Sequence, residues 1–164
     1  MGKKVENRRM RFRGQFTRTL DHKGRLAIPA KFRHILEATA GGEVVVTRGH
    51  DRSLEIYPLT TWEEFEEKEL LSLPYSKLQA RRFRRHYIFQ IKEDKLDQQG
   101  RILIPDFLLE YAGIEKEVVI VGEIDKITLW SPEEYDRFQL LIRENFERDS
   151  EEIESIRRSN EGIR

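Results

Sequence analysis

The hydrophobic positions of this chain follow the same order of elements twice. Each half begins with two short alternating stretches, the second ending in proline. A helical pattern, two further strands and a second helix then follow. In the first half these elements are expected at 16–20, 25–29, 30–38, 43–48, 53–57 and 58–70. In the second half they are expected at 91–96, 101–105, 106–114, 117–122, 126–130 and 131–141. The pattern therefore predicts an internally duplicated α+β protein.

A ten-residue motif is common to the two halves. Residues 20–29 read LDHKGRLAIP and residues 96–105 read LDQQGRILIP. An aspartate favours a turn because its carboxylate accepts hydrogen bonds from nearby backbone N–H groups, and glycine permits the positive φ that tight turns require. We expect each motif to form a turn that joins two paired strands. The predicted turn-forming residues are Asp21, Gly24, Asp97 and Gly100.

An arginine follows each predicted turn. Asp21 could pair with Arg25, and Asp97 with Arg101. Such a pair fixes the direction of a guanidinium group without using all of its donors. Because a single hairpin is marginal in water, the two copies are expected to interleave about a pseudo-two-fold axis and share one barrel core.

The duplication divides the chain into five expected segments. These are a basic, flexible extension over 1–10, a first repeat over 11–74, a basic linking helix and strand entry over 75–92, a second repeat over 93–138, and a charged helical tail over 139–164. In the last helix, Ser131 is expected to be the N-cap residue with Pro132 behind it.

The charge of the chain is unevenly distributed. The 164 residues include 30 basic and 30 acidic ones, which gives a net charge of zero. Residues 1–36, however, contain eleven basic and two acidic side chains, whereas residues 131–164 contain six basic and ten acidic ones. A split of this kind indicates an anionic partner for one face of the protein.

The composition argues against several kinds of chemistry. Cysteine is absent, so disulfides and thiolate chemistry are excluded. The four histidines, His22, His34, His50 and His86, lack metal-ligand spacing, and we expect no metal or cofactor. No apolar run approaches the ~18 residues of a membrane helix and no secretory signal is present, so a cytoplasmic protein is expected.

Two Asp-x-x-Gly turns could form a proton-sharing carboxylate dyad, as in an aspartic protease. That site requires small residues after each aspartate, and here the turns continue with His22-Lys23 and Gln98-Gln99. The sequence also lacks a nucleophile elbow, a P-loop and a zincin motif. We therefore expect no enzymatic activity.

On these motifs the chain resembles the MraZ family, within the AbrB-like group of swapped-hairpin, double-split β-barrel proteins. The resemblance covers roughly residues 11–140. It is carried by FRG at 12–14, LDHKGRLAIPAKFR at 20–33, VVVTRG at 44–49, LEIYP at 54–58, ARRFRR at 80–85, LDQQGRILIP at 96–105, YAGI at 111–114 and EVVIVG at 117–122. It implies an internally duplicated double-split β-barrel with short flanking helices and a C-terminal helical tail.

The resemblance also implies a function. It suggests a DNA-binding transcriptional regulator, a repressor of the division and cell-wall gene cluster in bacteria, associated with the nucleoid. It further implies a ring-like homo-oligomer whose hairpin loops meet repeated sites on double-stranded DNA. By position, the DNA-binding residues would be Arg13, Lys23, Arg25 and, in the second copy, Arg101. Because Gln99 occupies the position equivalent to Lys23, the first hairpin is expected to dominate.

The sequence also allows other functions and other roles for its basic residues. The chain could be an AbrB-like antitoxin or a protein-binding module whose acidic tail binds a protein partner, although such antitoxins carry one hairpin per chain.

Four arginines of the linking helix could bind phosphate, or they could be solvated or paired with the acidic residues at 63–69. They are Arg81, Arg82, Arg84 and Arg85. Arg8, Arg9 and Arg11 could form a non-specific basic arm. Tyr57, Trp62, Trp130 and Tyr135 are expected to pack in the core rather than stack on bases.

Overall fold

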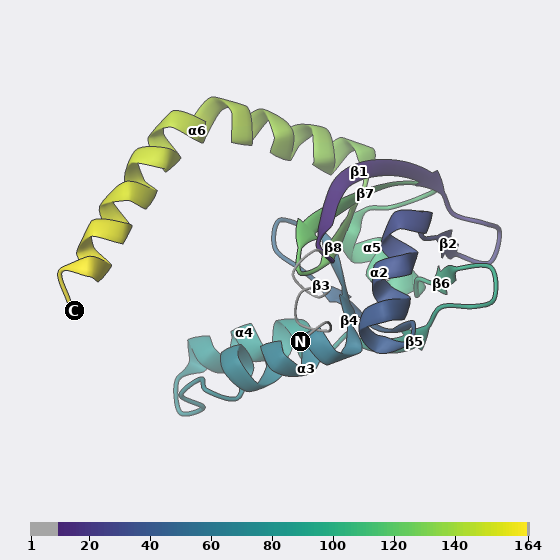
Figure 1. Ribbon diagram of the computed structural model, residues 1–164, viewed down its shortest axis with the longest axis horizontal. Helices are drawn as coiled ribbons and strands as arrows, with labels where there is room; N and C mark the ends of the chain where they lie inside the picture. Colours follow the sequence, from purple (N-terminus) through teal and green to yellow (C-terminus); the bar gives the residue numbers. More distant parts are fainter. Residues whose placement is uncertain (1–9, 164) are drawn as a thin grey trace.

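The computed structural model of the chain describes residues 10–163 (Figure 1). All but the last residue of the expected basic extension lies outside the described residues. The first half contains β1 (Phe12–Thr19), β2 (Arg25–Ala27), α2 (Ala30–Ala40), β3 (Glu43–Arg48), β4 (Leu54–Pro58), α3 (Leu59–Phe65) and a π-helical turn, η1 (Glu66–Leu70). After it come α4 (Leu78–Ile88), β5 (Lys92–Lys95), β6 (Arg101–Leu103), α5 (Asp106–Ala112), β7 (Glu117–Ile124), β8 (Ile127–Trp130) and α6 (Pro132–Glu161).

The element order of the two halves is the predicted one, and specific residues mark where the helices begin and end. Helices α2 and α5 begin directly after Pro29 and Pro105. They end at Gly41 and Gly113, whose φ angles of +64° and +67° are left-handed and favour glycine. At the start of α6, the Ser131 hydroxyl accepts the backbone N–H of Glu134 at 3.1 Å, which confirms the expected N-cap.

Strand pairing exchanges partners between the repeats. The antiparallel six-stranded sheet has the order β1-β7-β8-β4-β3-β5, and β2 pairs only with β6. The prediction that each turn joins two paired strands is therefore wrong. Strand β1 instead matches all eight residues of β7, from Phe12 opposite Ile124 to Thr19 opposite Glu117. This exchange leaves β2 and β6 free to form a separate two-stranded sheet, which we call the ribbon.

The sheet remains open within residues 10–163. Strands β1 and β5 are its outer strands, and no pairing between them closes it. The structure thus shows a mixed α+β protein with antiparallel strands. The finer assignment of a closed, double-split barrel stays a prediction.

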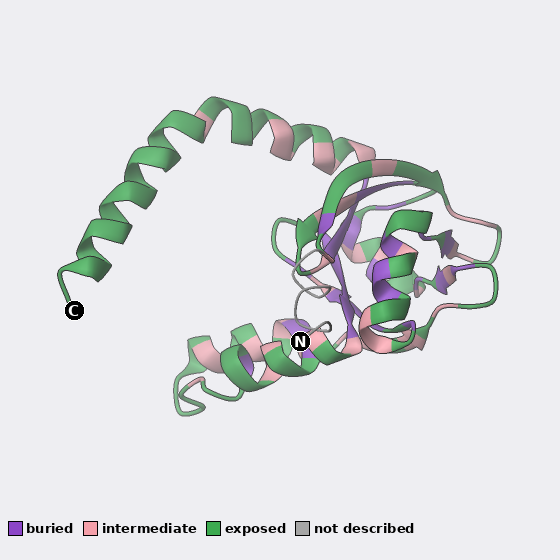
Figure 2. Cartoon of the chain, viewed as in Figure 1, coloured by how far each residue is buried: buried purple, intermediate pink, exposed green. Residues whose placement is uncertain are grey.

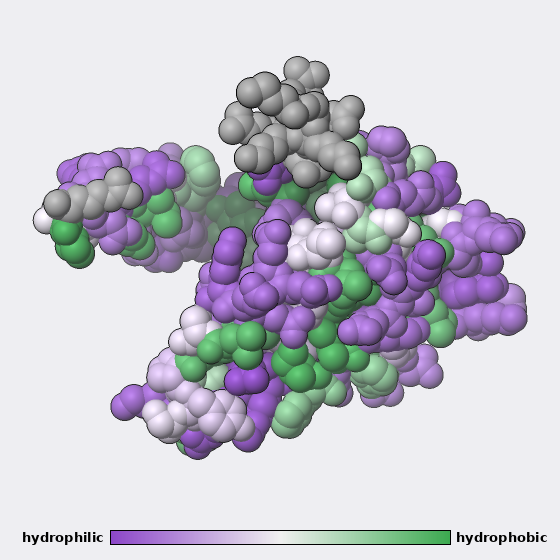
Figure 3. All heavy atoms as spheres, turned by 60° about the horizontal axis from the view of Figure 1, so that its bottom comes forward, coloured by the Kyte–Doolittle hydropathy of each residue, from purple (hydrophilic) through white to green (hydrophobic). Residues whose placement is uncertain are grey.

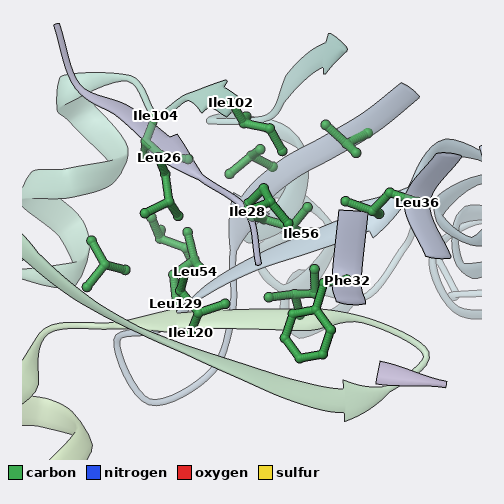
Figure 4. Packing of buried hydrophobic residues seen from close by; sticks show 14 of the residues in the cluster. Leu26, Ile28, Phe32, Leu36, Leu54, Ile56, Ile102, Ile104, Ile120 and Leu129 are labelled. Atoms are coloured by element: carbon green, nitrogen blue, oxygen red, sulfur yellow. The ribbon is translucent and has the colours of Figure 1, made fainter. Parts of the chain in front are cut away.

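One apolar core joins the ribbon to the rest of the fold (Figure 4). Its labelled side chains come from the ribbon, from the residues directly after each ribbon strand, from α2 and from the sheet. They are Leu26, Ile28, Phe32, Leu36, Leu54, Ile56, Ile102, Ile104, Ile120 and Leu129. Each of them is at most 4% exposed. Because alternate residues of a strand point to opposite faces, burying Leu26 and Ile102 turns the residues beside them outward.

A second, smaller cluster holds α3, η1 and α4 against the sheet. It consists of Val45, Tyr57, Trp62, Leu70 and Tyr87. Trp130 is also buried and stacks on Phe138 of α6 with ring centroids 5.3 Å apart. The core-packing expectation is therefore confirmed for Tyr57, Trp62 and Trp130. Tyr135 is only partly buried. Figure 2 shows how burial concentrates in the body and stops along α6.

Two leucines of the ribbon provide a matched test of this arrangement. Leu26 is fully buried, so Leu26→Ala should lower the free energy of unfolding by about 2–5 kcal/mol through lost transfer energy and a cavity. Leu103 is 40% exposed on the outer face, so Leu103→Ala should change it by less than about 0.5 kcal/mol. Urea denaturation of both variants measures the difference. Equal losses would contradict the observed facing of the ribbon.

Candidate nucleic-acid interface

The loop before β2, residues 20–24, is held by the carboxylate of Asp21. Its Oδ1 atom accepts the backbone N–H groups of Lys23 and Arg25, both at 2.9 Å. The backbone carbonyl of Asp21 accepts the N–H of Gly24 at 3.0 Å, and Gly24 has a φ of +81°. The turn therefore needs both an acceptor side chain and a residue without Cβ, as predicted.

The loop before β6, residues 96–100, repeats this geometry. Asp97 Oδ1 accepts the N–H groups of Gln99 at 2.8 Å and Arg101 at 2.9 Å, and Gly100 has a φ of +72°. Arg33 of α2 packs over this turn, so close that a Cβ on Gly100 would lie 2.4 Å from its Cδ atom. Sequence reasoning missed Arg33 as a loop neighbour because 66 positions separate it from Gln99, whose carbonyl oxygen lies 3.5 Å from its Nη1 atom.

The predicted aspartate–arginine pairs are present in both loops. Arg25 Nε donates to Asp21 Oδ2 at 2.7 Å, and Arg101 Nε donates to Asp97 Oδ2 at 2.9 Å. A further contact was not predicted, because Arg101 Nη1 also lies 3.5 Å from Asp21 Oδ2. Asp21 thus contacts the arginines of both repeats and links the two loops.

The register of the ribbon places both arginines on one face. Arg25 lies opposite Leu103, and Ala27 lies opposite Arg101. The two arginines are therefore diagonal neighbours, with Cα atoms about 7–8 Å apart. Their side chains are 28% and 25% exposed, so each guanidinium is partly supported by the protein and partly open to solvent.

Both loop carboxylates are stabilised in the ionised form. The backbone N–H of Arg25, assisted by its guanidinium and by the N–H of Lys23, outweighs partial burial and lowers the pKa of Asp21 to about 2. The corresponding N–H of Arg101 lowers the pKa of Asp97 in the same way. At neutral pH each arginine is therefore oriented by a charged acceptor.

The structure brings together three of the four predicted DNA-binding residues. Lys23, Arg25 and Arg101 belong to the paired loops and the ribbon. Arg13 instead lies near the start of β1, opposite Glu123. Thr19, at the other end of the strand, lies six positions further along the chain, a distance of about 20 Å. Arg13 is exposed, and its carbonyl oxygen accepts a 3.4 Å hydrogen bond from Lys31 of α2.

The α4 arginines occupy a different part of the surface. Helix α4 and the two loops lie at different sides of the body (Figure 1). Arg81 donates to the carbonyls of Tyr75 and Ser76, while Arg84 and Arg85 lie over the rings of Tyr75 and Phe89. Across residues 10–163, none of the four arginines forms an ion pair with an acidic residue.

Neither a metal centre nor a membrane segment emerges from the part of the chain that the structure describes. No three His, Cys, Asp or Glu side chains within it converge as metal ligands. Its helices also lack the combination of length and apolar character that crossing a bilayer requires.

The fold and the site define a class: an internally duplicated α+β protein that presents two oriented arginines on a surface ribbon. Comparison with known proteins agrees with the duplication. The family described as "MraZ protein, putative antitoxin-like" matches the chain twice, at residues 11–86 and 90–155.

Individual relatives match over most of their length. The transcriptional regulator MraZ of Natranaerobius thermophilus is 42% identical over 142 residues, which cover 87% of this chain and 96% of that protein. The proteins of the same name from Moorella thermoacetica and Thermomicrobium roseum are 43% and 44% identical, covering 77% and 76% of this chain and 85% and 84% of their own. The chain belongs to the MraZ family.

The charge state of Asp21 gives a pH-dependent prediction. Because folding lowers the pKa of Asp21, its ionised carboxylate stabilises the native state at any pH above 3.8, the ordinary pKa of the group. This contribution is lost as the pH falls toward 2. A carbon-detected NMR titration should place the midpoint of Asp21 at about 2. Arg25→Ala should raise the midpoint, because the guanidinium donor is removed. Lys31→Ala, which leaves the loop untouched, should not move it. A wild-type midpoint near 3.8 would contradict the loop geometry.

Proposed function

We propose that this chain is a sequence-specific, DNA-binding transcriptional regulator. It acts as a repressor at the promoter of the division and cell-wall gene cluster, in the cytoplasm at the nucleoid. The observation that carries the proposal is the outer face of the ribbon, where Arg25 and Arg101 lie side by side and each is oriented by a carboxylate. That the relatives are named transcriptional regulators supports it.

The ribbon suits the major groove of DNA. That groove admits a two-stranded β-ribbon, and an arginine there can bind the O6 and N7 atoms of guanine with two donors. Arg25 uses its Nε atom to bind Asp21, and among the described residues its terminal nitrogens have no protein acceptor. These nitrogens form the fork that bidentate recognition requires.

The two loops are proposed to contribute unequally. Arg101 directs one terminal nitrogen back toward Asp21, so less of its fork is free than in Arg25. Lys23 adds an exposed ammonium group to the first loop, whereas the second loop has Gln99 at the equivalent position. We therefore assign guanine readout to Arg25, phosphate contact to Lys23, and a weaker contact to Arg101.

Arg13 is proposed as a separate contact. Its distance from the loops means that it would meet the phosphate backbone away from the base edges that Arg25 reads. The two repeats, proposed over 11–74 and 93–138, then share a double-split barrel core of AbrB-like type that holds both loops.

Repression would follow from promoter occupancy by several copies of the chain. In a homo-oligomeric ring, each copy presents a first loop to one of several spaced DNA repeats. Because binding of a second loop is intramolecular, avidity can exceed the affinity of one site by about 10²–10⁴.

The loop carboxylates support a non-enzymatic role. A proton-sharing dyad needs two carboxylates that cannot both ionise. Here Asp21 and Asp97 are each bound to an arginine, and the pKa of each is lowered. We also prefer the regulator to an antitoxin, because this one chain carries both loops, whereas the expected antitoxin has a single copy.

Arginine 25 is the first residue to test. Fluorescence anisotropy would measure binding to DNA from upstream of the chain's own gene and to scrambled DNA. Arg25→Ala should weaken binding to the upstream DNA by roughly 5- to 150-fold, the equivalent of about 1–3 kcal/mol for one bidentate contact, and reduce the preference over scrambled DNA. Arg137→Ala, which removes an equal charge on α6, should have little effect. Absence of binding by the folded wild type in low salt would refute the proposal.

The difference between the loops can be tested by exchange. Gln99→Lys should strengthen binding and steepen the dependence of log K on log salt by about 0.9 for the one phosphate gained. Lys23→Gln should weaken binding and flatten the slope by a similar amount. A salt series on both variants measures the slopes. If neither slope changes, the loop tips do not contact phosphate.

A further inference from the structure

The second half of α6 is an exposed helix with an apolar stripe. The helix begins against the body, where Phe138 stacks on Trp130 and the Tyr135 hydroxyl bonds to Gln15. It then leaves the body as a free arm (Figures 1 and 2). All residues from 146 to 163 are exposed. Nothing in the rest of the described chain covers this arm.

The stripe has the spacing of a helix-packing seam. Ile142, Phe146, Asp149, Ile153 and Ile156 follow one another at intervals of four, three, four and three residues, which places them on one face. Four of the five are large apolar side chains that are 46–66% exposed. An apolar seam of this length on an isolated helix marks a packing surface for another element.

The charge of this part of α6 indicates what kind of element packs against the seam. Residues 144–161 contain seven acidic and three basic side chains. Asp149 lies in the middle of the seam. If two α6 helices packed in parallel and in register, Asp149 would meet its own copy, and like charges in contact are unfavourable. A basic partner helix would instead neutralise it.

Helix α4 has the complementary surface. It contains four arginines and no acidic residue, and the described chain supplies no acidic partner for them. Apolar side chains are exposed beside these arginines, since Leu78, Phe83 and Phe89 are 45%, 39% and 71% exposed. Figure 3 turns the α3–α4 side forward and shows hydrophobic residues exposed among hydrophilic ones on this face.

A groove runs beside α4. It has a volume of about 480 Å³ and is lined on one side by α4, with Arg82, Phe83 and Tyr87, and on the other by Tyr111 and by Gly49, His50 and Asp51 of the turn between β3 and β4. Arg82 is exposed and donates no hydrogen bond to an acceptor among the described residues. An apolar helix face bearing a central carboxylate would find apolar walls here, and Arg82 as a cation on the α4 side.

From these surfaces we infer that α6 docks through its seam, which runs from Ile142 to Ile156, on α4 and its groove in a second copy of this chain. The seam packs against the exposed apolar residues of α4, and Asp149 faces the arginines. This contact joins two different surfaces. The copy that uses its arm keeps a free groove, and the copy that uses its groove keeps a free arm, so further copies can add at both ends. Such a contact forms a ring if its rotation closes, and a filament if it does not. The inference rests on the proposed homo-oligomer and names its contact.

Two variants with exposed substitutions test the contact. The arm variant is Phe146→Asp/Ile153→Asp, and the groove variant is Arg82→Glu/Arg85→Glu. The control is Arg148→Glu/Arg158→Glu, on the side of α6 away from the seam. It changes the charge as much as the groove variant does and twice as much as the arm variant. Circular dichroism checks that each full-length variant is folded. Light scattering after size exclusion measures its mass.

The expected result is specific to a contact between unlike surfaces. Wild type and control form the same large assembly, whereas each variant alone has the mass of one chain. An equal mixture of the two variants gives a dimer and nothing larger, because only one intact arm and one intact groove remain. If the groove variant assembles like wild type while the arm variant does not, the arms pair with each other and the inference is wrong. A monomeric wild type would also overturn it.

DNA binding separates this inference from the proposed function. On DNA with several repeats, the arm and groove variants, as monomers, should bind about 10²- to 10⁴-fold more weakly than wild type. On DNA with a single repeat, they should bind as tightly as wild type. If the groove variant keeps its assembly but loses affinity on a single repeat, α4 grips phosphate and the docking is refuted. If wild type binds no DNA, the regulator proposal fails, and the mass measurements still decide the docking.

Discussion

The pairing of β2 with β6 is the constraint on which the rest of this structure depends. It joins the two repeats, and its period-two alternation sorts every ribbon side chain to one of two faces. The inner face carries Leu26 and Ile102 into the common core. The outer face then necessarily carries Arg25 and Arg101. A shift of one residue would bury the arginines and expose the core, so packing and site are set by the same register.

The loops add orientation to this placement. Each aspartate binds two backbone N–H groups of its loop with one oxygen and the arginine with the other. The carboxylate therefore shapes the turn and aims the side chain at once. Because Asp21 also approaches Arg101, the two aimed groups are coupled, and the repeats present one surface instead of two independent tips.

This architecture allows DNA binding and self-association, as proposed above, to use separate surfaces of the molecule. The ribbon and loops lie on one side of the body, and α4 and the arm of α6 extend elsewhere (Figure 1). A surface that binds a polyanion and a surface that binds a second copy do not compete when they are separated in this way. Avidity on repeated sites requires that separation, since every copy must keep its loops free while its neighbours are bound.

Much of this could be predicted from the sequence. The repeated motif established the duplication, the turn residues and the aspartate–arginine pairs, because these depend on contacts within five residues and on the period of the strands. Local reasoning paired each strand with its neighbour along the chain, and the tertiary structure exchanged the partners: β1 pairs with β7 over eight residues, and β2 pairs with β6. The contact of Arg101 with Asp21 and the position of Arg33 over Gly100 were likewise decided only in three dimensions. The physical reason is the same in each case, since residues 66 or more positions apart meet through packing of the shared core, which local propensity does not encode.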